Sequence, residues 1–192
     1  MRIVVGMSGS TGAIYGIRLL EVLAGLKDME IHLVISNPAK ETIVMETDYT
    51  VKQVEAMAHK VHGINNIAAS IASGSFKVDG MAVVPCSIKT LSSIANSFNE
   101  NLLVRAADVT LKEHRRLILV VRETPLHVGH LRLMVQAAEI GAIITPPMPA
   151  FYHKPKTIDD IVNQTVGRVL DLLGVEHPDL FKRWAGPERP SG

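Results

Sequence analysis

The sequence predicts a doubly wound α/β fold, in which helices cover both faces of a mostly parallel sheet, as in Rossmann-like and flavodoxin-like three-layer sandwiches. Three observations support this prediction. Short apolar runs recur along the 192 residues, segments with helical periodicity separate them, and a glycine-rich turn follows the first run. Apolar strands that alternate with helices favour parallel pairing, because right-handed crossovers place helices on both sides of a sheet.

Each element follows from its local pattern. Continuous apolar character, typical of strands buried on both faces, predicts strands at residues 2–6, 31–35, 81–84, 117–121 and 142–145. Helical spacing of apolar residues predicts helices over about 13–26, 38–46, 51–61, 87–97, 101–113, 127–140 and 157–173. Two helix starts carry capping signals, Thr50 with Gln53 and Thr157 with Asp160.

The composition restricts the class of protein. The formal net charge of +1 means that no overall field attracts nucleic acid or an anionic membrane. No apolar run approaches the ~20 residues of a membrane span, and the chain opens on a strand pattern without a leader. The single cysteine, Cys86, has no partner for an internal disulfide, so we expect a cytoplasmic protein.

The length fits one domain, which we expect to cover residues 1–176. Residues 177–192 show little periodicity and are expected to form either an arm on a neighbouring subunit or a disordered tail. Hydrophobic residues make up 47% of the chain, an excess that favours a homo-oligomer with apolar interfaces.

The first turn carries glycines with the spacing G-x-x-G-x-x-G at Gly6, Gly9 and Gly12. A glycine-rich turn that opens a helix offers backbone N–H groups to a phosphate. The dinucleotide fingerprint is absent, however, and Ser36 follows the second strand where an acidic residue would bind a ribose. No Walker loop is present either. NAD and ATP are therefore disfavoured, and the glycines also fit a purely packing role.

A second helix start with hydroxyl groups follows the third predicted strand. Ser36, Ser87 and Thr90 are placed to cap one phosphate of a mononucleotide together, although Ser87 also fits a simple helix cap. Cys86 lies in the same turn, but no sequence feature marks a base that would activate it as a nucleophile.

Charged and aromatic residues gather in two later stretches. Arg122 and Glu123 come directly after a buried strand, where a ligand site of such a fold belongs, whereas Lys112 at a helix end fits either a site or solvent. The proline-rich loop at 146–155 presents Tyr152, and the helix after it carries Arg168. A stiff loop of this kind suits a lid over a flat ring.

Two tempting metal signals are better explained without a metal. His127-x-x-His130 lies on one helix face but has no third ligand pattern. Asp159 and Asp160 fall in the first turn of a helix, where the macrodipole favours acidic residues. We therefore predict no metal site.

Seven stretches together resemble one known family. They are SGSTGAIYG, the ETD at 46–48, the SGSF at 73–76, PCSIKTL, LVRAADVTLKEHR, VRETPL and PPMPAFYHKP. This combination is similar to the bacterial flavin prenyltransferases of the UbiX type, long described as aromatic-acid or polyprenyl-hydroxybenzoate decarboxylases. The resemblance runs from about residue 2 to Trp184.

The resemblance implies a metal-independent reaction. Reduced FMN and dimethylallyl phosphate would be joined at flavin N5 and C6, giving prenylated FMN and phosphate. The product would serve decarboxylases of the UbiD type, as in ubiquinone biosynthesis or aromatic acid decarboxylation. A homododecamer is also implied.

The resemblance further assigns roles by motif. The FMN-binding residues it implies are Gly9, Ser10, Thr11, Ser36, Ser87, Ile88, Lys89, Thr90 and Arg122. The residues it implies for dimethylallyl phosphate are Lys112, Arg122, Tyr152 and Arg168, and its catalytic positions are Thr11, Glu46, Lys112 and Glu123. Thr11 departs from the serine that many members carry, which keeps the hydroxyl and adds a methyl group beside the flavin.

Three alternatives remain at this point. An FMN-dependent decarboxylase of cysteine-derived carboxylates would share the architecture, but the chain lacks that family's Pro-Ala-Ser-Ala-Asn-Thr stretch and has PCSIKT instead. A non-catalytic flavin carrier would leave Lys112, Glu123, Tyr152 and Arg168 without a role. Direct decarboxylation of an aromatic acid fits these residues less well than departure of a phosphate.

Overall fold

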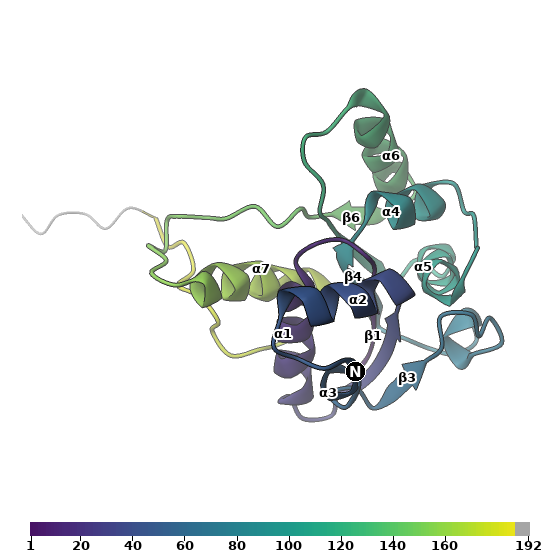
Figure 1. Ribbon diagram of the computed structural model, residues 1–192, viewed down its shortest axis with the longest axis horizontal. Helices are drawn as coiled ribbons and strands as arrows, with labels where there is room; N and C mark the ends of the chain where they lie inside the picture. Colours follow the sequence, from purple (N-terminus) through teal and green to yellow (C-terminus); the bar gives the residue numbers. More distant parts are fainter. Residues whose placement is uncertain (187–192) are drawn as a thin grey trace, which may run out of the picture.

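The computed structural model describes residues 1–186, and these form a parallel sheet of six strands between layers of helices (Figure 1). The strand order is β3-β2-β1-β4-β5-β6, and every pair is parallel. The strands are β1 (Arg2–Met7), β2 (Glu30–Ile35), β3 (Lys60–His62), β4 (Gly80–Cys86), β5 (Arg116–Val121) and β6 (Ala142–Ile144). The predicted doubly wound α/β class is confirmed.

The helices connect these strands. They are α1 (Ala13–Ala24), α2 (Asn37–Glu46), α3 (Val51–Glu55), α4 (Ile88–Ala95), α5 (Leu102–Lys112), α6 (Val128–Glu139) and α7 (Ile158–Leu173), with a short 3₁₀ turn at Ser70–Ala72. Both predicted capping boxes are present. Thr50 and Gln53 exchange side-chain and backbone hydrogen bonds at the start of α3, and Thr157 and Asp160 do so at the start of α7.

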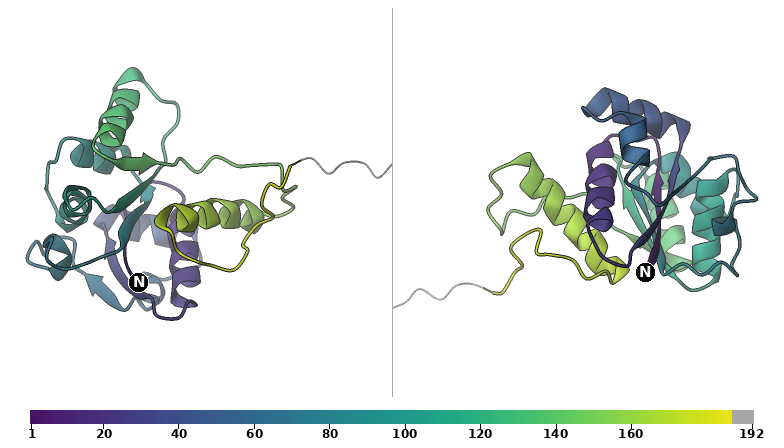
Figure 2. Two further views of the ribbon diagram at one scale, coloured as in Figure 1. Left: turned by 180° about the vertical axis from the view of Figure 1, so that it is seen from behind. Right: turned by 90° about the horizontal axis from the view of Figure 1, so that it is seen from below.

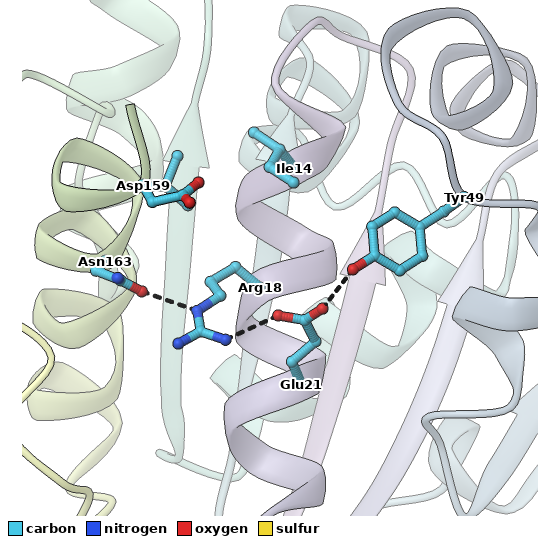
Figure 3. A pocket seen from close by; sticks show the side chains of 7 residues that line it. Ile14, Arg18, Glu21, Tyr49, Asp159 and Asn163 are labelled. Carbon is cyan, nitrogen blue, oxygen red and sulfur yellow. Dashed lines mark hydrogen bonds and ion pairs between the residues drawn. The ribbon is translucent and has the colours of Figure 1, made fainter. Parts of the chain in front are cut away.

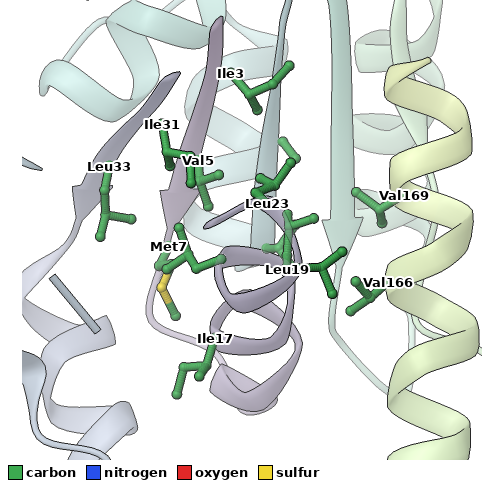
Figure 4. Close-up of a cluster of buried hydrophobic side chains, with 14 of the residues drawn as sticks. Ile3, Val5, Met7, Ile17, Leu19, Leu23, Ile31, Leu33, Val166 and Val169 are labelled. Carbon is green, nitrogen blue, oxygen red and sulfur yellow. The ribbon is translucent and has the colours of Figure 1, made fainter. Parts of the chain in front are cut away.

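Two apolar cores hold the layers together, one on each face of the sheet. Alternate strand residues such as Ile3 and Val5 pack with α1 and α7 on one face (Figure 4). Their neighbours, such as Val4 and Met81, pack with α4 and α5 on the other. The view from below in Figure 2 shows α1 and α7 on one side of the sheet and α5 on the opposite side. Burial on both faces explains the uninterrupted apolar runs.

One predicted helix is wrong in part. The pattern over 51–61 predicts a single helix, but α3 ends at Glu55 and the chain then forms the edge strand β3. Only His62 of the three β3 residues is buried, so this strand lacks the apolar run by which the others are detected. Its pairing with β2 is decided by tertiary contacts instead.

The segment from β6 to α7 leaves the body of the molecule, and α7 returns to pack on α1 (Figure 1). A cavity of about 290 Å³ lies between these helices, but its polar groups bind one another (Figure 3). Arg18 donates from Nε to Asn163 Oδ1 at 2.8 Å and from Nη1 to Glu21 at 2.8 Å, and Tyr49 donates to Glu21 at 2.6 Å. This network fixes the position of α7.

The first part of the predicted tail lies against the protein's own α7. Phe181 packs on Gly167 of this helix, and Figure 2 shows the yellow segment running back along α7. The last part of the tail, residues 187–192, lies outside the described residues.

Candidate functional site

A cavity of about 510 Å³ opens at the carboxyl ends of β1, β2, β4 and β5. The sheet order reverses between β1 and β4, and in open α/β sheets the crevice at such a switch point is where ligands bind. Nine of the residues predicted for the site line this cavity: Gly9, Ser10, Ser36, Ser87, Ile88, Lys89, Thr90, Arg122 and Glu123.

The loops around the cavity are tied together by short hydrogen bonds. The buried Ser8 hydroxyl donates to the Pro85 carbonyl at 3.1 Å and accepts from the Ser87 backbone N–H at 2.8 Å. The Arg122 N–H donates to the Cys86 carbonyl at 3.0 Å, and the Ser36 N–H donates to the Met7 carbonyl at 2.9 Å. The cavity walls are therefore fixed by the sheet itself.

Two helices begin at this cavity. The Ser36 side chain accepts a hydrogen bond from the Ala39 N–H to cap α2, and the Ser87 side chain accepts one from the Thr90 N–H to cap α4. Helix N-termini attract anions, because their free N–H groups and macrodipoles carry positive charge. The Ser10 hydroxyl is buried and has no hydrogen-bond partner among the described residues. These donors fit the phosphate of a mononucleotide.

Gly9 is required by the approach of α2 to the first turn. A Cβ atom on Gly9 would lie 2.3 Å from the Pro38 Cβ, closer than such atoms come in proteins. One of the glycines of the motif is therefore explained by a packing contact that also forms the wall of the cavity.

The side chain of Glu46, the last residue of α2, lies at the N-terminus of α1. Its Oε2 accepts hydrogen bonds from the Gly12 N–H at 2.8 Å and the Ala13 N–H at 3.2 Å. Partial burial acts to raise the pKa of Glu46. The hydrogen bonds from Thr11, Gly12 and Ala13 and the charge of Arg122 outweigh it, so the pKa lies below its ordinary value. Thr11 and Glu46 therefore form a hydrogen-bonded pair at the start of α1, and neither of these two predicted residues lines the cavity.

The charge of Arg122 also affects the pKa of the Tyr15 phenol. Burial raises the pKa of Tyr15, and the positive charge of Arg122 opposes this effect. Cys86 lies in the same turn but is fully buried, and burial raises the pKa of its thiol. A protonated, inaccessible thiol agrees with the sequence argument against a cysteine nucleophile.

Lys112 is placed away from this cavity within one chain. It is the last residue of α5, which leads to the first residues of β5, so it lies at the amino edge of the sheet. Its Nζ pairs with Glu113 and lies beside Gly74, in the segment that precedes β4. Six-residue strands span about 20 Å, so a single copy does not join Lys112 to Glu123.

Tyr152 and Arg168 likewise lie outside the cavity of their own chain. Tyr152 belongs to the projecting segment and contacts the ring of Trp184 at 5.9 Å. Arg168 lies on α7 and pairs with Asp171 at 2.8 Å. The predicted site residues thus fall into three separate groups in one copy of the chain.

Sequence reasoning missed six further residues that line the cavity: Asn37, Pro38, Ile64, Asn65, Glu100 and Asn101. Pro38 and Asn101 carried detectable signals, since one is a proline in a first helical turn and the other caps α5. Ile64 and Asn65 follow the unpredicted strand β3, so no local pattern places them. Glu100 pairs with the exposed Lys89 at 3.5 Å across the cavity mouth.

The two discounted metal signals have structural roles. The His127 ring accepts hydrogen bonds from the Gly129 and His130 N–H groups and so caps α6. Asp160 belongs to the capping box of α7. Within residues 1–186, no three His, Cys, Asp or Glu side chains are grouped to hold a metal ion.

Known proteins resemble the chain over almost its full length. The Flavoprotein family model matches residues 1–170. A flavin prenyltransferase UbiX from Thauera aromatica is 62% identical over 188 residues, which are 98% of this chain and 96% of that protein. The chain belongs to the UbiX family of flavin prenyltransferases.

Solved structures agree with this assignment. AnUbiX (PadA1), solved with FMN and dimethylallyl pyrophosphate, is 52% identical, with a TM-score of 0.94 over 97% of this chain and 98% of that one. A dodecameric FMN-dependent UbiX-like decarboxylase of Escherichia coli O157:H7 is 49% identical, with a TM-score of 0.94 over 97% of this chain and all of that one.

Membership of the UbiX family confirms the predicted flavin prenyltransferase. It disfavours both the cysteine-type decarboxylase and the flavin carrier. None of the helices within residues 1–186 has the length and apolar character needed to cross a membrane.

Proposed function

We propose that this UbiX-family protein joins a dimethylallyl group from dimethylallyl phosphate to N5 and C6 of reduced FMN, without a metal ion. The observation that carries the proposal is the cavity at the switch point of the sheet, where two helix N-termini, serine and threonine hydroxyl groups and Arg122 converge. The FMN and dimethylallyl pyrophosphate bound to the relative AnUbiX support the same chemistry.

The flavin phosphate would be held at the starts of α2 and α4. Ser36, Ser87 and Thr90 supply hydroxyl groups there, and the unpartnered hydroxyl of Ser10 supplies another. Gly9, Thr11, Ile88, Lys89 and Arg122 complete the proposed flavin site. Reduced flavin supplies electron-rich ring atoms, and the protein has to orient them and exclude water.

The cations would act on the phosphate that departs. Negative charge grows on this group as the allylic C–O bond breaks, so fixed donors stabilise the transition state more than the bound substrate. Lys112, Arg122, Tyr152 and Arg168 are the proposed donors. Removal of one such donor is expected to lower the rate by about 10²- to 10³-fold.

Glu123 is the proposed acceptor of the ring proton lost when C6 is alkylated, unless the released phosphate takes it. It lines the cavity and its side chain is exposed, so a carboxylate is available there. Glu46 and Thr11 would hold the turn beside it through their hydrogen bonds.

The complete site would be built from more than one copy of the chain. Lys112, Tyr152 and Arg168 lie apart from the cavity of their own chain, yet all three are exposed. The exposed apolar residues Val128, Leu131 and Val135 on α6 favour a homo-oligomer. A dodecamer, as in the Escherichia coli O157:H7 relative, is the assembly we propose.

The product would be prenylated FMN, released in the cytoplasm for decarboxylases of the UbiD type. Anaerobic incubation with reduced FMN and dimethylallyl phosphate tests the reaction, because the flavin should gain the mass of one prenyl group. An unchanged flavin mass would contradict the proposal.

Mixed oligomers test the composite site. Lys112→Ala and Glu123→Gln should each lower the rate at least about 10²-fold alone, but co-assembled chains should regain activity in those sites that combine an intact Lys112 with an intact Glu123. If both residues served the same chain's site, every mixed site would lack one of them and activity would stay low.

A further inference from the structure

The chain folds back on itself after α7 and forms an arm from Val175 to Trp184 (Figure 2). Val175 is 4% exposed, and Leu180 packs against the core shared with α1. Phe181 lies directly on α7 at Gly167, where a Cβ atom would come within 2.5 Å of the phenyl ring. The arm is therefore seated on the turn of α7 that carries Arg168.

One carboxylate joins the arm to Arg168. Asp171 Oδ2 accepts from Arg168 Nη1 at 2.8 Å and from Arg183 Nη1 at 2.9 Å. Asp171 Oδ1 accepts from Arg183 Nη2 at 2.9 Å and contacts His177 Nε2 at 3.2 Å. The hydrogen bonds from Arg183, with those from His177 and Arg168, lower the pKa of Asp171 to about 2.

This arrangement is more specific than an ordinary surface ion pair. The Arg183 contact is bidentate, and paired N–H donors on one carboxylate fix direction as well as distance. The His177 side chain is 1% exposed, and its Nδ1 lies 2.7 Å from the Pro178 carbonyl. Its two ring nitrogens thus face two oxygen acceptors. The buried ring therefore links the start of the arm to Asp171.

The same arm touches the loop that carries Tyr152. The Trp184 ring meets the Tyr152 ring edge-on at 5.9 Å, and the Phe181 ring meets the His153 ring at 6.5 Å. Arg168 and Tyr152, which come from different elements, are therefore connected through the arm. Arg168 remains half exposed and uses Nη1 for Asp171, so the N–H groups of its Nη2 and Nε can donate to an anion.

We infer that Asp171 is a positioning residue for prenyl transfer, which directs the Arg168 guanidinium and latches the C-terminal arm that supports Tyr152. This inference rests on the proposed roles of Arg168 and Tyr152 toward the phosphate of the prenyl donor. Without the carboxylate, two guanidinium groups and the His177 ring would face one another, and repulsion would turn Arg168 away. A displacement of 1 Å can cost about 10²-fold in rate.

The sole tryptophan reports directly on the arm, since Trp184 is the one tryptophan of the chain. In the full-length, ligand-free protein, Asp171→Asn and Arg183→Gln should each lower the steady-state anisotropy of its fluorescence, because Trp184 is already 65% exposed and release of the arm changes its mobility rather than its exposure. Asp179→Asn is the matched control. This substitution removes the same charge, and Asp179 is an exposed residue that also contacts Arg183, at 3.4 Å. Equal anisotropy in all variants would overturn the latch.

Kinetics test the positioning of Arg168. Asp171→Asn should lower kcat/KM for dimethylallyl phosphate at least about tenfold, while the Kd for FMN and the parameters of Asp179→Asn stay at their normal values. In an Arg168→Met background, Asp171→Asn should change the kinetics little further, because both substitutions remove the same contribution of Arg168. Additive effects would show that Asp171 acts independently of Arg168 and would overturn the inference.

The outcome for Arg168→Met alone separates this inference from the function on which it rests. An unchanged kcat/KM for dimethylallyl phosphate in that variant would refute the proposed role of Arg168 itself. A lowered kcat/KM in Arg168→Met together with a normal kcat/KM in Asp171→Asn would leave the proposed function intact and refute the positioning role alone.

Discussion

Gly9→Ala is the most direct test of how the cavity is built. The added methyl carbon would lie 2.3 Å from Pro38 Cβ, whereas ordinary contacts begin near 3.4 Å. The start of α2 must therefore move by about 1 Å relative to the first turn. Pro38 is held in the first turn of its helix, so the Ser36 cap moves with it.

The size of the effect follows from the hydrogen bonds at stake. A hydrogen bond to a charged group contributes about 1.5–3 kcal/mol, which is about tenfold to a hundredfold in affinity. Displacement of the Ser36 end of the cavity by about 1 Å is enough to break one such bond to the flavin phosphate. We therefore expect the Kd for FMN, measured by quenching of flavin fluorescence, to rise by about 10- to 100-fold.

The matched control is Gly25→Ala. Gly25 caps the other end of α1 with a φ of −80°, and the nearest atom to an added Cβ there is 3.5 Å away. This variant should bind FMN normally and keep its thermal midpoint. If Gly9→Ala also bound FMN with wild-type affinity, the cavity would not hold the flavin phosphate where we propose.

Three further predictions address chemistry and stability. Glu123→Gln should lower turnover by about 10²- to 10⁴-fold with little change in the Kd for FMN, and loss of flavin binding would mean that this carboxylate has a different role. Burial, with the nearby His32 and Lys60, lowers the pKa of His62, so the unfolded chain takes up a proton below about pH 6.5 that the folded chain resists. Urea titrations should therefore show stability falling from about pH 6.5 downward, and His62→Gln should flatten this slope, whereas identical slopes would refute the argument. Iodoacetamide should label Cys86 in urea but not in the native protein, and rapid native labelling would contradict its burial.

The strands that the sequence reveals most clearly are those buried on both faces. In β1, β2 and β5 nearly every residue after the first is buried, and such runs are visible without any knowledge of the fold. The edge strand β3 has one buried residue, His62, whose ring lies 2.9 Å from His32 Nδ1. A contact of this kind depends on residues 30 positions apart, so local periodicity cannot predict it.

The site residues likewise divide into those that local sequence predicts and those that it does not. Ser36, Ser87 and Arg122 could be predicted because each follows a strand directly, and parallel strands bring their carboxyl ends to one edge. Lys112 was assigned by motif alone, and its place at the amino edge of the sheet follows only from the structure. Local sequence describes a residue's own element, whereas the proposed site between copies would depend on an assembly that no local pattern encodes.

The unusual glycine spacing is explained by the group that lies at the N-terminus of α1. In dinucleotide-binding sheets the pyrophosphate lies at the N-terminus of the helix after β1. Here the carboxylate of Glu46 takes that place through the Gly12 and Ala13 N–H groups, because α2 runs from the end of β2 back toward α1. The positive end of α1 is thereby neutralised within the chain. The anion-binding capacity of the switch point remains with α2 and α4, which favours the proposed phosphate of a mononucleotide there over the pyrophosphate of a dinucleotide.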